Sequence, residues 1–141
     1  MDKERLTRLL DHFGVRITPV RHLLYRALEE ASTAMSLNDL ETELVTVDKS
    51  SIFRNLQLFL GVGLIHQIQD GSGIAKYAVN QSHEHSHAHF TCEVCGETIC
   101  LDGLSLDYSQ LLLPEGYKAG GYTLIIKGVC PHCNKKQWRL P

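Results

Sequence analysis

The sequence has no run of apolar residues long enough to cross a membrane, which takes about 18 residues. It also lacks an excess of positive charge, because 14 Lys and Arg stand against 16 Asp and Glu. A global positive field that could hold nucleic acid is therefore excluded, and any such binding requires a local patch. The amphipathic N-terminus lacks the apolar core of a signal peptide, so we expect a cytoplasmic protein with no membrane partner.

Cysteine and histidine are the clustered residue types. The 141 residues include five Cys and eight His, with four of the His at 83–89 and four of the Cys in two close pairs. Disulfides are not expected in a reducing compartment, and an odd number of cysteines argues against a closed disulfide framework. The clusters therefore indicate metal ligands.

The two cysteine pairs have the spacing of a structural zinc site. They are Cys92-x-x-Cys95 and Cys130-x-x-Cys133, with 34 residues between them. Four thiolates in this pattern bind Zn²⁺ tetrahedrally. A half-chain of about 57 residues buries only a modest core, so a structural zinc ion would help it fold.

The histidine segment offers a second candidate metal site. His83, His85, His87 and His89 alternate, so an extended backbone would direct all four imidazoles to one side. We expect His87 and His89 to be ligands because they lie close to the first cysteine pair. Two interpretations stay open for His83 and His85, which are ligands or part of a solvated linker.

Cys100 is the remaining thiol, and it is either a further ligand or a small buried apolar residue. As a ligand beside imidazoles it would favour zinc over iron. Catalysis would need a nearby acid or base, and only Glu84 and Glu97 are adjacent. We therefore do not expect an enzyme.

The N-terminal part of the chain has helical periodicity. Apolar spacing predicts helices over 4–13, 19–31, 37–44 and 49–60, with Thr18, Ser36 and Asp48 as N-cap residues. Gly61 and Gly63 are expected to end the last of these helices, and a β-hairpin is expected over 64–79 with its turn at 70–73. Short helices followed by a hairpin are typical of a winged helix-turn-helix.

The C-terminal part mixes strands and a helix. Strands are expected at 90–92, at 97–101 and within 117–127, where 122–126 is the clearest part, and a helix is expected at 104–113. The predicted fold class is α+β. Its parts are an N-terminal winged helix-turn-helix domain (1–80), a His-rich hinge (81–89) and a small zinc-stapled α/β domain (90–141).

Five short motifs follow one another between about residues 5 and 135. They are Arg16-Ile17-Thr18-Pro19-Val20-Arg21, Ser50-Ser51-Ile52-Phe53-Arg54-Asn55-Leu56, Gly63-Leu64-Ile65, His87-x-His89-x-x-Cys92-x-x-Cys95-Gly96 and Gly128-x-Cys130-x-x-Cys133. In this order the chain resembles the ferric uptake regulator family. The resemblance implies a dimeric, metal-responsive transcriptional repressor whose C-terminal α/β domain mediates dimerisation.

The resemblance also implies a set of DNA contacts. The helix with Ser50, Ser51, Phe53, Arg54 and Gln57 would be the recognition helix in the major groove. Arg54 would contact phosphate or guanine, while Phe53, where the family usually has Tyr, would keep only an apolar contact to a thymine methyl group. Arg16 matches a minor-groove position and Arg21 a backbone-contacting one.

The residues themselves give partial support to this interface. Arg16, Arg21 and Arg26 form a stretch without acidic residues, which is the local patch that the net charge of −2 conceals. A solvated helix face is the alternative interpretation of the same stretch.

The implied regulatory site departs from the family pattern. Ala34, Ala78 and Tyr122 stand where many members carry ligands, and Cys100 replaces an acidic residue. A sensing site would then consist of His87 and His89, with Cys100 and one of His83 or His85. It would bind a second Zn²⁺ or Fe²⁺.

The sequence thus predicts a homodimeric, metal-dependent repressor of metal homeostasis that binds a double-stranded DNA operator. It would most closely fit a zinc-responsive regulator of the zinc uptake type. The alternatives are an iron- or peroxide-responsive regulator of the same family, or a zinc-ribbon adaptor that binds protein and not DNA.

Overall fold

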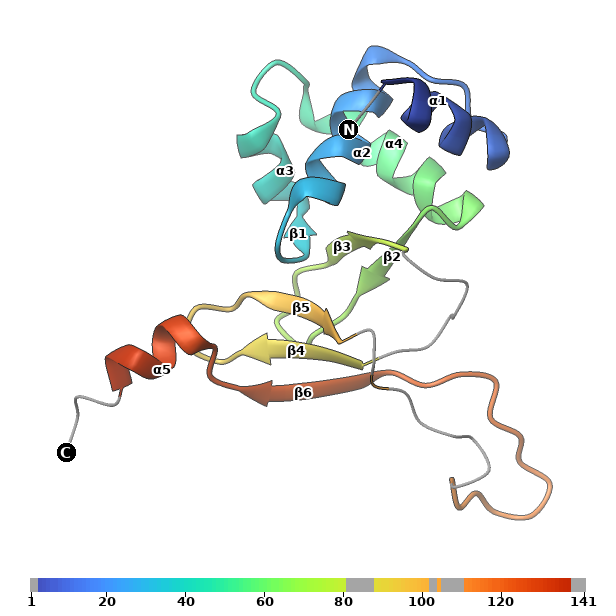
Figure 1. Ribbon diagram of the computed structural model, residues 1–141. Coiled ribbons are helices and arrows are strands. Elements are labelled where there is room, and N and C mark those ends of the chain that lie inside the picture. The colour runs from blue at the N-terminus through green and yellow to red at the C-terminus, as the bar shows by residue number, and fades with distance from the viewer. Residues whose placement is uncertain (1–2, 81–87, 102–103, 105–110, 138–141) are drawn as a thin grey trace. The chain divides into compact units, whose positions relative to one another are not determined.

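The computed structural model describes residues 3–80, 88–101, 104 and 111–137 (Figure 1). The chain forms two compact units, Met1–Gln81 and Ser82–Pro141. No helix in the described ranges is long and apolar enough to span a membrane.

Four helices make up most of the first unit, as the periodicity predicted. They are α1 (Lys3–His12), α2 (Pro19–Glu30), α3 (Leu37–Glu43) and α4 (Lys49–Val62). The Thr18 hydroxyl oxygen accepts the backbone N–H of Arg21 at 3.2 Å, and a carboxylate oxygen of Asp48 accepts that of Ser51 at 3.1 Å. These side chains satisfy N–H groups that a helix start leaves without an intrahelical partner, so both predicted caps are confirmed.

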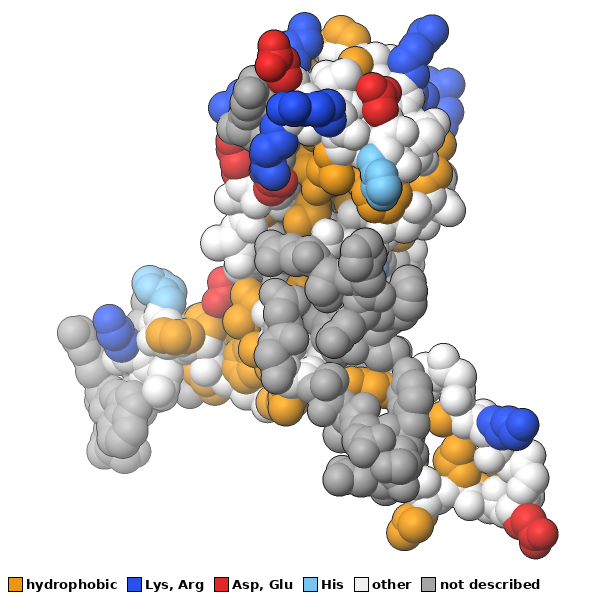
Figure 2. Space-filling model, turned by 45° about the vertical axis from the view of Figure 1, so that its right-hand side comes forward, with side chains coloured by type: hydrophobic (Ala, Val, Ile, Leu, Met, Phe, Trp, Pro, Cys, Tyr) orange, Lys and Arg blue, Asp and Glu red, His pale blue; other side chains and the backbone are white. Residues whose placement is uncertain are grey.

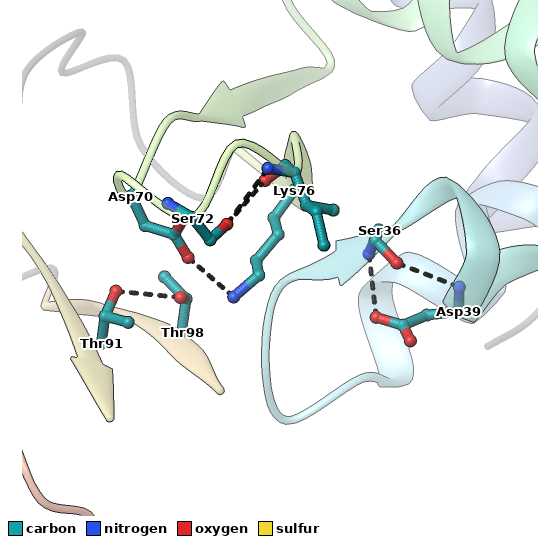
Figure 3. A network of polar contacts seen from close by, with 8 residues as sticks. Ser36, Asp39, Asp70, Ser72, Lys76, Thr91 and Thr98 are labelled. Atoms are coloured by element: carbon teal, nitrogen blue, oxygen red, sulfur yellow. Dashed lines mark hydrogen bonds and ion pairs between the residues drawn. The ribbon is translucent and has the colours of Figure 1, made fainter. Parts of the chain in front are cut away.

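The start of α3 is held by a capping box (Figure 3). The Ser36 hydroxyl accepts the N–H of Asp39 at 3.1 Å, and the Asp39 carboxylate accepts the N–H of Ser36 at 3.0 Å. Ser36 also belongs to the short strand β1 (Met35–Ser36), which the sequence did not predict. Two residues are too few to show the alternation that identifies a strand.

The end of α4 differs from the prediction. The helix continues through Gly61 to Val62, and Gly63 is the C-cap with φ of +84°. Only this second glycine adopts the left-handed conformation that closes a helix, and a Cβ there would be strained. Gly61 was therefore wrongly assigned to the helix end.

The predicted hairpin is present with shorter strands, β2 (Ile65–Ile68) and β3 (Lys76–Val79), in an antiparallel sheet of order β1-β3-β2. An ion pair connects its loop to the start of β3, where the Lys76 ammonium lies 2.7 Å from a carboxylate oxygen of Asp70. The other Asp70 oxygen accepts the N–H of Ser72 at 3.0 Å (Figure 3). The Asp70 side chain has 0% exposure, so the carboxylate depends on these partners.

The core of the first unit joins all four helices to the hairpin. Its fully buried side chains include Leu6, Leu10, Leu24, Leu40, Ile52, Leu56 and Phe59. Phe59 packs edge-to-face against Tyr25, with ring centroids 6.2 Å apart. One face of α4 is thereby fixed in the core, and the opposite face is left for other contacts.

The second unit contains a three-stranded sheet and a short helix. The strands are β4 (Ala88–Cys92), β5 (Thr98–Leu101) and β6 (Leu124–Gly128), in the order β5-β4-β6, with β4 antiparallel to β5 and parallel to β6. Gly128 ends β6 beside Phe90, whose ring would lie 3.2 Å from a Cβ at this position. The close approach explains the glycine.

The elements of this unit differ from the prediction in two places. The last strand begins two residues later than the predicted 122–126. The helix α5 (Pro131–Gln137) was not among the predicted elements. The predicted helix at 104–113 falls mainly on 105–110, outside the described residues, and Leu104 and residues 111–113 are not helical.

The Asp70–Lys76 pair gives a test of the first unit. We expect Asp70→Ala to lower the free energy of unfolding by about 3 kcal/mol, because it leaves the Lys76 ammonium, 12% exposed, without its carboxylate. Urea unfolding measures the change. The double variant Asp70→Leu/Lys76→Met should recover much of the loss, and a single variant as stable as the wild type would contradict this account.

Candidate metal centres and nucleic-acid interface

Cys92, Cys95, Cys130 and Cys133 converge at one end of β4. Their four sulfur atoms all lie within 4.8 Å of one another. Cys92 is the last residue of β4, Cys130 follows β6, and Cys133 lies in α5. The described cysteines form no disulfide. Four sulfurs at such separations suit one tetrahedral ion of the zinc type, which is what the spacing predicted.

Backbone N–H groups donate hydrogen bonds to the sulfur atoms of this cluster. The N–H of Cys130 donates to the Cys92 sulfur at 3.3 Å, and the N–H of Cys133 donates to the Cys130 sulfur at 3.5 Å. Gly96, with φ of +81°, closes the first turn by donating its N–H to the carbonyl of Cys92 at 2.9 Å. Amide hydrogens directed at sulfur stabilise thiolates, so the loops favour the ligating form.

The thiols of the cluster have shifted pKa values in opposite directions. Hydrogen bonds from the backbone of Cys95 and Cys130 lower the pKa of Cys92 to about 6. Burial, followed by the neighbouring cysteines, raises the pKa of Cys133 to about 12. One thiolate thus opposes the ionisation of the next, and four thiolates together require a cation.

His89 and Cys100 form a second cluster within the same unit. They lie directly opposite each other in the β4–β5 register, so their side chains share one face of the sheet. A ring nitrogen of His89 and the Cys100 sulfur lie within 4.8 Å of each other, and His89 is buried. The structure therefore places the unassigned thiol beside one of the two expected histidine ligands.

The remaining histidines of the hinge, His83, His85 and His87, lie outside the described residues. The positions where the family resemblance implied missing ligands are described. Ala34 is buried, Ala78 lies in β3, and Tyr122 lies just before β6.

His66 in the hairpin is a candidate ligand that the sequence analysis missed. It lies directly opposite Ala78 in the β2–β3 register. Its Nδ1 is 2.6 Å from Oδ1 of Asn80, whose Nδ2 donates to the carbonyl of Gly63 at 2.8 Å. Because Oδ1 only accepts, Nδ1 carries the proton, so in the neutral ring Nε2 carries the lone pair, which is the arrangement of many metal-binding histidines. No local pattern marks it, since the signal is a cross-strand contact.

The outward face of α4 carries the residues expected to contact DNA. Phe53 is 45% exposed and is not part of the core of the first unit, although it is aromatic. Ser50, Arg54 and Gln57 are exposed as well. Figure 2 shows Lys and Arg side chains over the helical unit, with Asp and Glu side chains among them.

Ser51 and Arg54 are organised by the cap of α4. The Ser51 hydroxyl donates to the Asp48 carboxylate at 2.7 Å and accepts a hydrogen bond from Arg54 at 3.3 Å. The hydrogen bonds from Ser51 lower the pKa of the Asp48 carboxyl. Ser51 is half-buried, so its hydroxyl serves the helix start and the orientation of Arg54.

The three arginines of the predicted basic stretch have different surroundings. Arg16 is exposed, Arg21 is half-buried, and Arg26 forms an exposed ion pair with Glu30 at 2.9 Å. The Arg21 guanidinium donates to Asn55 of α4 at 3.0 Å and to the carbonyl of Arg16 at 2.8 Å. The basic patch is thus smaller than the sequence suggested, because Arg26 is paired with an acidic residue and Arg21 is bonded to groups of the protein.

Comparison with known proteins identifies the family. A sequence model described as the ferric uptake regulator family matches residues 12–126. The chain belongs to the ferric uptake regulator family. It is accordingly a metal-responsive, DNA-binding transcription regulator and not an enzyme, as predicted, and the adaptor alternative is not supported.

Two relatives of this chain carry names that refer to peroxide. The peroxide operon regulator of Bacillus subtilis (strain 168) is 30% identical over 141 residues, covering 96% of this chain and 94% of that protein. The peroxide-responsive repressor PerR of Staphylococcus aureus (strain USA300) is 26% identical, covering 87% of this chain and 85% of that protein.

Solved structures of the family share the fold. A zinc uptake regulator complexed with zinc and DNA aligns with a TM-score of 0.69 at 21% identity, covering 96% of this chain and 94% of that chain. The ferric uptake regulator of Vibrio cholerae aligns with a TM-score of 0.68 at 19% identity, covering 88% and 98%. The α+β fold expected from the sequence is therefore that of the family.

The four-cysteine cluster gives a second test. We expect Cys130→Ser to abolish the tightly held ion and to unfold the second unit, because zinc binding in such sites contributes on the order of 10 kcal/mol to folding. Elemental analysis after mild chelation and circular dichroism measure both effects. Cys100→Ser is the matched control and should keep the tightly held ion. Retention of that ion by Cys130→Ser would contradict the assignment.

Proposed function

We propose that this chain is a zinc-responsive repressor that controls metal homeostasis as a homodimer on a double-stranded DNA operator. The observation that carries the proposal is the His89–Cys100 pair. A thiolate beside an imidazole favours zinc over the harder ions, which prefer oxygen ligands.

Two ions per chain are proposed, with different roles. The four cysteines would hold a structural Zn²⁺ that stays bound. A second, exchangeable ion would be bound by His87, His89 and Cys100, with one of His83 or His85 as a further ligand. Zn²⁺ is preferred over Fe²⁺ as this regulatory ion because the donor set includes a thiolate.

DNA recognition is assigned to the first unit, residues 1–80, as a winged helix-turn-helix with β2 and β3 as the wing. The helix α4 would enter the major groove with Ser50, Ser51, Phe53, Arg54 and Gln57. Arg16 would reach the minor groove, and Arg21 would lie near the DNA backbone. Residues 90–141 would form the dimerisation domain, with 81–89 as the hinge.

Regulation requires the regulatory ion to bind one arrangement of the dimer more tightly than the others. In the favoured arrangement, the two α4 helices would reach half-sites about one DNA turn apart, roughly 34–36 Å. The histidines of the hinge would then link ion binding to that arrangement. A cytoplasmic location agrees with this function and stays a prediction.

Peroxide sensing is the second candidate, favoured by the names of the relatives at 30% and 26% identity. Histidine oxidation by peroxide needs bound iron in a site of histidines and carboxylates. The described regulatory positions supply alanine at 34 and 78 and cysteine at 100. The thiolate thus favours the zinc proposal, and iron loading followed by peroxide treatment separates the two.

A titration of the chain that keeps its structural ion tests the proposal. A duplex is first selected from a random pool with the zinc-loaded protein. Zinc should then raise affinity for this duplex by tenfold or more, and His89→Gln should remove the response while the tightly held ion remains. If zinc does not change the affinity for this duplex, the proposal that the chain senses zinc is wrong. Fe²⁺-dependent binding abolished by peroxide would instead establish the second candidate.

A further inference from the structure

A chain of hydrogen bonds joins α4 to the segment that carries Arg16. Oδ1 of Asn55 accepts Nε–H of Arg21 at 3.0 Å, and Nδ2 of Asn55 donates to the carbonyl of Ser51 at 2.8 Å. A second nitrogen of Arg21 donates to the carbonyl of Arg16 at 2.8 Å. We call Asn55 and Arg21, with the two carbonyl groups that they contact, the Asn55 bracket.

Both ends of the Asn55 amide are occupied inside the bracket. The donor is directed at Ser51 and the acceptor at Arg21, which also fixes the orientation of the amide. Asn55 is half-buried, whereas Arg54 and Gln57 beside it are exposed. The amide is therefore directed at protein groups, although it lies in the middle of the proposed recognition helix.

The bracket fixes the backbone next to Arg16. This residue lies between α1 and α2, and its neighbour Val15 is buried with its N–H bonded to the carbonyl of Leu10 at 2.8 Å. The Arg16 side chain is exposed, while its carbonyl is held by Arg21. Arg21 itself lies in the first turn of α2, where its backbone N–H donates to the hydroxyl oxygen of the N-cap residue Thr18.

Recognition of two grooves at once depends on this spacing. The proposed function places α4 in the major groove and Arg16 in the minor groove, so both reach DNA only when their separation matches that of the grooves. A flexible Arg16 segment would pay ordering entropy on binding, whereas a segment already held in place would not.

We propose that Asn55 is a positioning residue, which fixes Arg16 relative to the recognition helix through Arg21 and does not contact DNA. The inference rests on the proposed function, because it concerns how the same surface reads its operator. It assigns Arg21 a role within the protein in addition to any contact with the DNA backbone.

A positioning residue and a contact residue affect salt dependence differently. Affinity falls as salt rises, and each phosphate contact that is lost reduces the magnitude of the slope of log affinity against log salt by about 0.9. Asn55 is neutral and is assigned no phosphate, so its loss should weaken specific binding and leave the slope unchanged. A variant that only unfolds the protein would instead reduce its stability in urea.

The experiment uses the full zinc-loaded chain, a duplex selected from a random pool and an unrelated duplex of the same length. Asn55→Leu removes both hydrogen bonds at similar volume, and we expect about a tenfold loss of affinity for the selected duplex. The slope and the affinity for the unrelated duplex should not change. Arg54→Gln is the contact control, and its slope should fall by about 1.

Two further variants keep the test decisive. Asn55→Ala also removes both hydrogen bonds, and it serves as the test variant if the leucine variant is unstable in urea. Arg21→Lys keeps the charge but loses the Nε–H. Combining it with Asn55→Leu should cost no more than the larger single loss, because both act through one contact.

The outcomes separate the inference from the function on which it rests. If no duplex is selected by the wild type, the DNA-binding proposal fails and this inference fails with it. If the wild type binds and Asn55→Leu binds equally well, or if Asn55→Leu lowers the slope by about 1, only the positioning role is overturned.

Discussion

Four thiolates cannot share one small volume without a cation, and the second unit is built on that constraint. Its described apolar cluster consists of Cys92, Cys130 and Cys133, with Phe90 and Val129 packed against them. The metal site therefore takes the place that a hydrophobic core has in the first unit. Since β4 ends at this cluster and the turn between β4 and β5 carries Cys95, the ion would also fix the two strands that carry His89 and Cys100 on one face.

What the sequence could predict depends on how local each determinant is. The helix caps at Thr18, Ser36 and Asp48 require residues three positions apart, and the cysteine pairs require a fixed short spacing, so both were predictable. The pairing of His89 with Cys100 depends on strand register, which no local pattern encodes. Likewise, the contact between Arg21 and Asn55 spans 34 positions and appears only when α2 packs on α4.

Charge shows the same limit of sequence analysis. The stretch from Arg16 to Arg26 contains no acidic residue, yet one helical turn beyond it Glu30 pairs with Arg26. Arg21 directs part of its guanidinium into the protein. Of these three arginines, only Arg16 has a side chain with no ion pair or hydrogen bond to the described residues. For DNA binding, a chain with a net charge of −2 then depends on the fixed positions of a few arginines more than on a broad positive surface.

Strand register bears on the positions where the family resemblance implied missing ligands. Residues directly opposite each other present their side chains on the same face, so a side chain can move to the neighbouring strand and keep its direction. His66 lies opposite Ala78 in this way, and Asn80 leaves its Nε2 as the nitrogen with the lone pair. Cys100 likewise faces His89 across the β4–β5 pair. The loss of ligands at single positions therefore does not by itself imply the loss of metal binding, because the donor atoms are set by the sheet and not by the sequence position alone.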